Sequence, residues 1–167
     1  RFESLADFLD PADPRRTRFV DRKPLEAFPD VDFADPRIKW ADMSGDRLQD
    51  IVLVRERRVE YWPNLGFGDF GARITMRNNP RLPIDYSPER VLLGDIDGDG
   101  VADLVYVGDG EVTLWLNRCG NGWSESIVIQ GTPPVSAIDT VRLVDLLGTG
   151  VAGVLWSRDA SPDRRAH

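Results

Sequence analysis

The sequence predicts an all-β protein, a partial β-propeller made of four-stranded antiparallel blades. An aspartate-rich loop recurs along the chain at a spacing of about 50 residues, which is the length of one blade. A short apolar strand follows each copy of the loop, and helical periodicity is nearly absent. A β-sandwich would also supply many short strands, but it would not explain why the loop returns at one fixed place in each repeat.

The second copy of the loop, residues 95–103, carries the clearest chemical signal. Carboxylates stand at positions 1, 3, 5 and 9 of this loop, and glycines stand at positions 4 and 6. Calcium loops supply side-chain oxygens from alternate residues and add a backbone carbonyl. The predicted ligands are therefore Asp95, Asp97, Asp99, the carbonyl of Val101, and Asp103. We expect Ca²⁺, with Mg²⁺ as the less favoured ion; the alternative is that the aspartates only accept hydrogen bonds from their own turn.

The other two copies depart from this pattern. The first keeps side-chain oxygens at all four positions and predicts a weaker site, formed by Asp42, Ser44, Asp46, the carbonyl of Leu48, and Asp50. Arg47 replaces its second glycine, where a left-handed backbone costs a non-glycine residue about 1 kcal/mol. The third copy retains only Asp145 and Thr149 as oxygen-bearing side chains, so we expect it to be a turn without a metal.

The loop register divides the chain into blades. Residues 37–89 and 90–137 form the two complete blades, and residues 138–160 form an incomplete third. Residues 1–36 are a linker or an incomplete preceding blade, with a short helix at Phe2–Leu9, and residues 161–167 are a frayed tail. In the second blade the expected strands are Val91–Gly94, Leu104–Val107, Glu111–Asn117 and Trp123–Ile129.

Two further patterns have structural explanations. Gly66–Gly71 matches G-x-G-x-x-G, but a strand pattern follows it, so we expect a hairpin loop and not a dinucleotide site. The five tryptophans recur at blade positions, and we expect them to pack in the core between blades, with a platform that stacks sugars as the alternative: Trp40, Trp62, Trp115, Trp123 and Trp156.

Composition excludes several classes of function. The net charge of −7 argues against nucleic acid as a partner. Cys119 is the only cysteine and His167 the only histidine, which removes Ser-His-Asp and Cys-His catalysis. No apolar stretch approaches the ~20 residues of a membrane-spanning helix, so no direct membrane insertion is expected. No signal peptide is visible and the chain starts at Arg1, so we interpret it as a segment of a longer protein.

Residue patterns resemble two known groups of proteins. The motif D-x-D-G-D-G-x-x-D before a strand resembles the calcium loops of FG-GAP, VCBS and integrin-α-type propeller repeats. More widely, the chain resembles the propeller region of the B component of Tc-type insecticidal toxins and the related amino-terminal half of Salmonella virulence plasmid B proteins. That resemblance rests on Ala34–Asp42, Val59–Asn64, Thr75–Leu82, Gly131–Val135 and Val141–Val151.

The resemblance implies a secreted, non-enzymatic module. In the toxin family this propeller docks the cocoon formed by the B and C components onto the pore-forming A component, and it gates passage of the toxin. The implied partners are therefore the other blades of the parent chain, the A-component channel and the C-component cocoon. The alternatives are a calcium-dependent adhesin or carbohydrate-binding repeat protein and, less favoured, a polysaccharide-cleaving enzyme built on a propeller.

Overall fold

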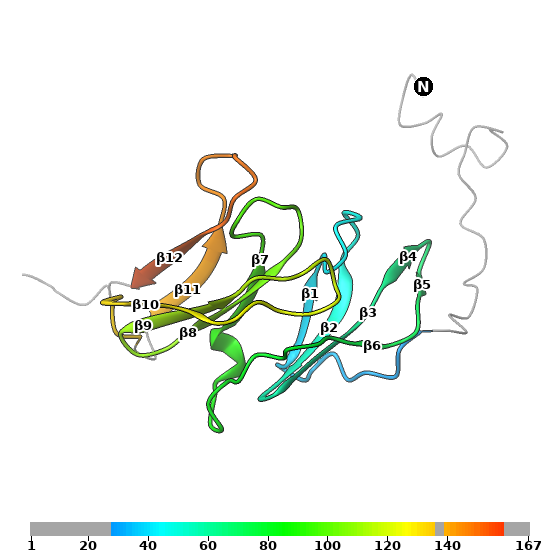
Figure 1. Cartoon of the computed structure of the whole chain (residues 1–167), viewed down its shortest axis with the longest axis horizontal. Coiled ribbons are helices and arrows are strands. Elements are labelled where there is room, and N and C mark those ends of the chain that lie inside the picture. The colour runs from blue at the N-terminus through cyan, green and yellow to red at the C-terminus, as the bar shows by residue number, and fades with distance from the viewer. Residues whose placement is uncertain (1–27, 136–138, 159–167) are drawn as a thin grey trace, which may run out of the picture.

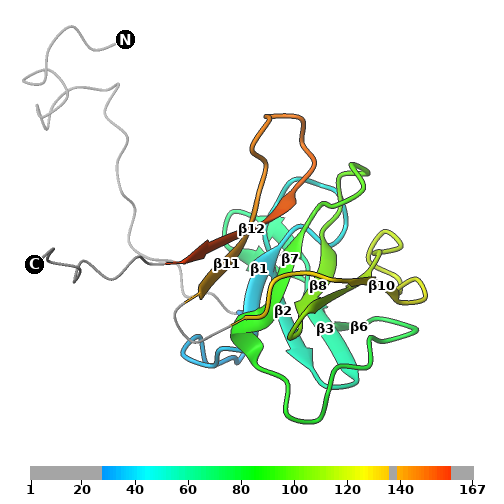
Figure 2. The ribbon, with the colours of Figure 1, turned by 90° about the vertical axis from the view of Figure 1, so that its left-hand side faces the viewer.

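The computed structural model describes residues 28–135 and 139–158, and the regular structure in this part of the chain is almost entirely antiparallel β-sheet. The first sheet has the order β1-β2-β3-β6 and the second the order β10-β9-β8-β7. A third sheet pairs β11 with β12, and a small hairpin pairs β4 with β5. The three larger sheets follow one another along the molecule (Figures 1 and 2), which confirms the all-β, partial-propeller prediction.

The element bounds are as follows. The first sheet contains β1 (Ile38–Ala41), β2 (Asp50–Arg55), β3 (Arg58–Trp62) and β6 (Ile74–Thr75). The small hairpin contains β4 (Asn64–Gly66) and β5 (Asp69–Phe70). The short 3-10 helix η1 (Pro88–Arg90) precedes β7 (Val91–Gly94), β8 (Asp103–Val107), β9 (Glu111–Trp115) and β10 (Ile127–Gln130). The third sheet contains β11 (Asp139–Val144) and β12 (Gly153–Arg158).

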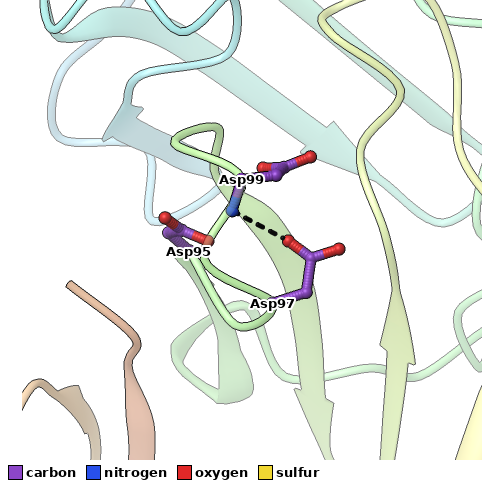
Figure 3. A group of neighbouring side chains, drawn as sticks. All are labelled: Asp95, Asp97 and Asp99. Carbon is purple, nitrogen blue, oxygen red and sulfur yellow. Dashed lines mark hydrogen bonds between the residues drawn. The ribbon is translucent and has the colours of Figure 1, made fainter. Parts of the chain in front are cut away.

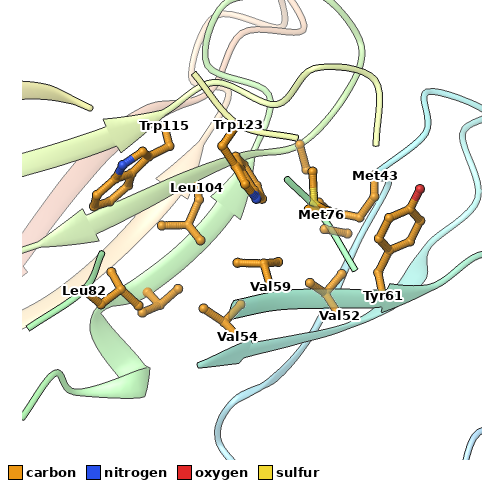
Figure 4. Packing of buried hydrophobic residues seen from close by; sticks show 13 residues of the cluster. Met43, Val52, Val54, Val59, Tyr61, Met76, Leu82, Leu104, Trp115 and Trp123 are labelled. Carbon is orange, nitrogen blue, oxygen red and sulfur yellow. The ribbon is translucent and has the colours of Figure 1, made fainter. Parts of the chain in front are cut away.

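Alternation along the strands builds two apolar layers, because successive side chains of a strand point to opposite faces of its sheet. Leu104 of β8 belongs to the layer between the first and second sheets, and its neighbour Val105 belongs to the layer between the second and third. Figure 4 shows the first layer, where valines of β2 and β3 meet Trp115 and Trp123 of the second repeat. The second sheet therefore packs one face against the first sheet and the other against the third.

The structure shifts the fourth predicted strand of the second repeat. Strand β10 begins at Ile127, and Trp123 forms only an isolated bridge with Asn117. The N–H of Trp123 donates to the carbonyl of Arg77 in the first repeat at 3.1 Å. Residues 122–124 still pair with the segment after β9, but the register shifts by one residue before Ile127, so the continuous strand starts there and the predicted start was wrong.

The tryptophan prediction holds for three of the five positions, whereas Trp40 and the partly buried Trp62 belong to neither apolar layer. Trp115 and Trp123 are buried, and Trp156 packs against the second apolar layer. Trp40 is 49% exposed and stacks on Phe33, with ring centroids 5.7 Å apart. It also packs edge-on against Phe70 of the β4–β5 hairpin and belongs to neither apolar layer. The Gly66–Gly71 segment forms the β4–β5 hairpin, as expected.

A charged group occupies the outer face of the first sheet. The Glu60 carboxylate is fully buried and pairs with three arginines that are each about half exposed. The nitrogen–oxygen distances are 2.7 Å to Arg55, 2.9 Å to Arg58 and 3.4 Å to Arg73. Three guanidinium groups compensate for burying this charge, so the outer face carries an excess of positive charge.

Some predictions fall outside the described residues, namely the helix at Phe2–Leu9 and the tail at 161–167. Within the described ranges, no helix has the length and apolar character needed to cross a membrane.

Candidate metal site

The three aspartate-rich loops occupy equivalent places in the three sheets. They connect β1 to β2, β7 to β8, and β11 to β12, so each joins the first two strands of its repeat. Their glycines adopt the left-handed backbone that the turn requires, with φ of 84° at Gly98 and 91° at Gly100. Arg47 takes this conformation too, with φ of 68°, as expected from its place in the repeat.

The second loop brings three carboxylates together. Ligand oxygens of Asp95, Asp97 and Asp99 all lie within 4.8 Å of one another (Figure 3). Backbone N–H groups orient the first of these side chains: Gly98 donates to Asp95 Oδ1 at 2.7 Å and Gly100 to Asp95 Oδ2 at 3.0 Å. The N–H of Asp99 donates to Asp97 Oδ1 at 3.2 Å. Three oxygen ligands at this spacing suit a hard divalent cation, and without one the carboxylates repel each other.

Asp103, the fourth predicted carboxylate ligand, is placed differently. It is fully buried and stands outside the three-residue group. Both of its oxygens accept backbone N–H groups, from Ile96 at 3.0 Å and from Asn117 at 2.8 Å. Desolvation raises the pKa of this carboxyl above its usual value, and the two N–H donors oppose that rise. Asp103 therefore ties the start of the loop to the end of β9. Val101, the predicted carbonyl ligand, is also buried.

The first loop repeats the anchoring but not the carboxylate group. Buried Asp50 accepts the N–H of Met43 at 2.9 Å and that of Asn64 at 2.8 Å, and burial raises its pKa in the same way. Asp42 accepts the N–H groups of Gly45 and Arg47 at 2.7 and 2.6 Å. In the described part of the chain, the three aspartates of this loop, including Asp46, do not form a close group of three carboxylates. The remaining predicted ligands are the Ser44 hydroxyl and the Leu48 carbonyl.

The third loop keeps only the turn-forming contacts. Asp145 accepts the N–H of Thr149 at 3.0 Å and that of Gly150 at 2.7 Å. These hydrogen bonds lower the pKa of Asp145 below its usual value, with the contact to Gly150 contributing most. The absence of a metal in this loop stays a prediction.

Neighbouring loops are locked to each other through their backbones. The N–H of Ala102 in the second loop donates to the carbonyl of Asp42 in the first at 2.8 Å. The N–H of Ala152 in the third loop donates to the carbonyl of Asp95 in the second at 2.7 Å, so the same contact recurs one repeat later. The loops therefore form a continuous row that joins the three sheets along one side of the molecule.

Close packing reinforces the same row. A methyl group of Val101 would lie only 3.1 Å from a Cβ placed at Gly45. The corresponding distance from Val151 to a Cβ at Gly98 is also 3.1 Å. The glycine at this loop position therefore serves two purposes, since it provides the left-handed turn and makes room for the valine of the next loop.

Asn117 is the residue that sequence reasoning did not single out. Its side chain is 1% exposed and donates to the carbonyls of Met43 and Ala102, both at 3.0 Å, while its Oδ1 accepts the N–H of Gly120 at 2.8 Å. It links the first loop, the second loop and the turn after β9. The sequence does carry a signal for this asparagine, since Asn117 follows Asp103 by 14 residues and Asn64 follows Asp50 by the same distance.

The arrangement offers oxygen ligands and no activated nucleophile. Cys119 is exposed, and no described residue pairs it with a general base. Backbone N–H groups orient Asp95 and Asp97 in the second loop, and cation binding there stays a prediction.

Comparison with known proteins agrees with the geometry of the repeats. The model of the FG-GAP-like repeat family matches residues 42–106 and 95–156. No curated protein matches the chain. Among solved structures, the TcdB2–TccC3 complex without its hypervariable C-terminal region matches 80% of this chain at 32% identity and a TM-score of 0.71. A Tc holotoxin pore of Photorhabdus luminescens matches 78% at 33% identity and a TM-score of 0.69.

The matched toxin chains are much longer, since this chain spans 6% of each. An Agrocybe aegerita lectin that recognises non-reducing terminal N-acetylglucosamine matches 70% of this chain and 31% of its own, at 23% identity and a TM-score of 0.55. This last similarity concerns the fold alone. The resemblance to the propeller region of Tc toxin B components is confirmed, and because the family model covers most of the described residues, the chain belongs to the FG-GAP-like repeat family.

Proposed function

We propose that the chain is a non-enzymatic propeller segment of a secreted Tc-type toxin B component. In this proposal it helps to dock the cocoon of B and C components onto a pore-forming A component and contributes to the gate for the translocated toxin. The similarity to TcB–TcC complexes, at 32% and 33% identity over about four fifths of the chain, is the observation that supports it.

The row of loops fits a docking role. Rigid scaffolds present their loops to partners, and a propeller gathers the loops of successive blades on one face. Here the hydrogen bonds from Ala102 to Asp42 and from Ala152 to Asp95 fix each loop against the next. A partner that binds this face therefore meets a surface that needs little ordering on association.

The proposal includes a cation in the second loop. Asp95, Asp97 and Asp99 would supply carboxylate oxygens to Ca²⁺, with the carbonyl of Val101 and Asp103 completing the set. Each Asp103 oxygen accepts one N–H group and keeps a lone pair, but the carboxylate stands outside the close group of three and would have to approach it to bind the same ion. A cation that binds only the folded chain stabilises it by ~2.7 kcal/mol at a hundredfold excess over its dissociation constant.

A chimera tests the docking role. This chain would replace the matching segment of TcdB2 in a TcdB2–TccC3 complex, and binding to a Tc A component would be measured by biolayer interferometry. A matched chimera would carry the fold-similar segment of the Agrocybe aegerita lectin. We expect the first chimera to bind the A component and the second to fail. If the first chimera assembles with TccC3 but does not bind, the docking proposal is wrong.

Calorimetric titration tests the cation site. We expect Ca²⁺ to bind the chain, and Asp97→Asn and Asp99→Asn each to weaken binding at least tenfold, because each removes a charged ligand. Asp109→Asn is the control, since this exposed carboxylate lies in the turn between β8 and β9 and outside the loops. If the unmodified chain and the three variants bind Ca²⁺ with equal affinity, the ion lies outside the second loop. If titration gives no heat and Ca²⁺ leaves the melting temperature unchanged, the chain has no such site.

A further inference from the structure

A polar pocket lies between the first two repeats, away from the aspartate loops. Its volume is about 730 Å³, which is within the range of small-ligand sites. The first repeat contributes the β2–β3 turn and the segment after β6, and the second contributes the end of β9 and the approach to β10. The lining residues are Arg57, Asn78, Asn79, Arg81, Trp115, Ser124, Glu125 and Ser126.

Hydrogen bonds fix the walls of this pocket. Asn79 accepts the N–H of Val59 at 2.7 Å and donates to the carbonyl of Met76 at 2.7 Å. The hydroxyl of Ser124 accepts the N–H of Leu116 at 2.9 Å. Just beside the pocket, the carbonyl of Arg77 and the N–H of Trp123 join the two repeats at 3.1 Å. The pocket is therefore formed before any ligand arrives, which lowers the cost of binding.

Two guanidinium groups are available to an anion. Arg81 is exposed and forms no ion pair or side-chain hydrogen bond with any residue that the structure describes. Arg57 donates its Nε to Glu56 at 3.0 Å, and this contact leaves both of its terminal nitrogens for a ligand. Guanidinium groups bind carboxylates through paired, charge-assisted hydrogen bonds.

The remaining groups select among anions. Glu125 lines the same pocket as the two arginines, so its carboxylate repels a ligand that carries negative charge along its whole length, such as an acidic peptide. The same carboxylate accepts hydrogen bonds from hydroxyl groups, and Asn78 and Ser126 add exposed donors and acceptors. Trp115, which is only 7% exposed, contributes a small apolar part of the wall.

We propose that this pocket binds a saccharide carrying a single carboxylate, such as a uronic acid unit. Arg81 and Arg57 hold the carboxylate, while Asn78, Glu125 and Ser126 hydrogen-bond the hydroxyl groups. Such binding is independent of the aspartate loops and of any cation in them, and it adds a ligand site to a module otherwise proposed to dock protein.

Nitrogen–proton NMR titration of the full chain tests the proposal with three probes. They are the disaccharide of glucuronic acid and N-acetylglucosamine, the neutral analogue with glucose in place of glucuronic acid, and N-acetyl-triglutamate. We expect the acidic disaccharide to shift the amide signals of Asn78, Arg81 and Ser126. We expect the neutral analogue and the peptide to bind at least tenfold more weakly, since each lacks one half of the recognised chemistry.

Variants locate the effect. The double change Arg57→Gln and Arg81→Gln should weaken binding of the acidic disaccharide at least tenfold, whereas Arg118→Gln, an exposed arginine outside the pocket, should not. Glu125→Gln should strengthen binding of the peptide by removing the repulsion. The proposal is overturned if the acidic disaccharide does not bind at millimolar concentration, if it binds the double variant equally well, or if the peptide binds the unmodified chain as tightly.

Discussion

Asn117 connects two neighbouring repeats through a side chain that water barely reaches. Its amide nitrogen donates to the carbonyls of Met43 and Ala102, and its oxygen accepts the N–H of Gly120. We predict that Asn117→Ala lowers the free energy of unfolding more than any substitution that removes one exposed loop hydrogen bond. The reason is that the replacement leaves two carbonyls and one N–H buried without partners.

The magnitude follows from these contacts. A net contribution of about 1 kcal/mol for each of the three hydrogen bonds gives a loss of about 3 kcal/mol. Asn64 provides a matched control, because it holds the equivalent position in the first repeat and makes two side-chain hydrogen bonds, to Gln49 and from Gly66. Asn64 is only partly buried, so water replaces its partners and Asn64→Ala should cost about 1 kcal/mol.

Urea unfolding followed by tryptophan fluorescence measures both changes. The experiments should contain excess chelator, so that any bound cation contributes equally to all three proteins. Unaltered dependence of the unfolding free energy on urea concentration would show that the compared states are the same. If Asn117→Ala costs no more than Asn64→Ala, Asn117 does not join the repeats energetically, and the argument from its buried contacts is wrong.

Three further predictions follow from local contacts. Arg47→Gly should stabilise the chain by about 0.5–1 kcal/mol by relieving a left-handed backbone, and a loss of stability in urea unfolding would contradict this. The Arg37 guanidinium lowers the pKa of Asp35 to about 2. The ion pair therefore contributes fully to stability above the usual pKa of 3.8, and this contribution is lost as the pH falls through about 2. Carboxyl NMR titration should show that Arg37→Ala returns the Asp35 pKa toward 3.8, and an unchanged value would exclude the ion pair as the cause. Glu60→Gln should lower the free energy of unfolding by about 2 kcal/mol, because it removes the buried negative charge that pairs with the arginines. An unchanged urea midpoint would mean that solvent already screens these ion pairs.

Sequence reasoning located the repeats because the signals that define them are local. The glycines that permit left-handed turns, the aspartates that accept the N–H groups of their own loop, and the alternating apolar strands all lie within a few residues of one another. The strands β7 and β9 accordingly start where the pattern placed them. The left-handed backbone of Arg47 was expected for the same reason, from its alignment with Gly100.

Contacts between repeats were beyond the sequence pattern. The predicted strand start at Trp123 failed because the register shifts by one residue before Ile127, in the stretch where Trp123 also bonds Arg77 of the first repeat. Trp40 stays half exposed because it lies outside both apolar layers. Spacing also did not indicate that both oxygens of Asp103 accept N–H groups, one from a residue 14 positions away; its role as a ligand stays a prediction.

By itself the sequence determined that this chain is a row of β-repeats with a cation-type loop at one fixed position, since turn geometry and strand alternation depend on neighbouring residues. The tertiary structure alone decided which of those loop residues face each other, as only Asp95, Asp97 and Asp99 converge. It also decided that Asn117 donates to Met43, 74 residues earlier, and that Arg57, Arg81 and Glu125 line one pocket. Such contacts depend on how one sheet packs on the next, and that packing is set by the whole buried interface and not by any local motif.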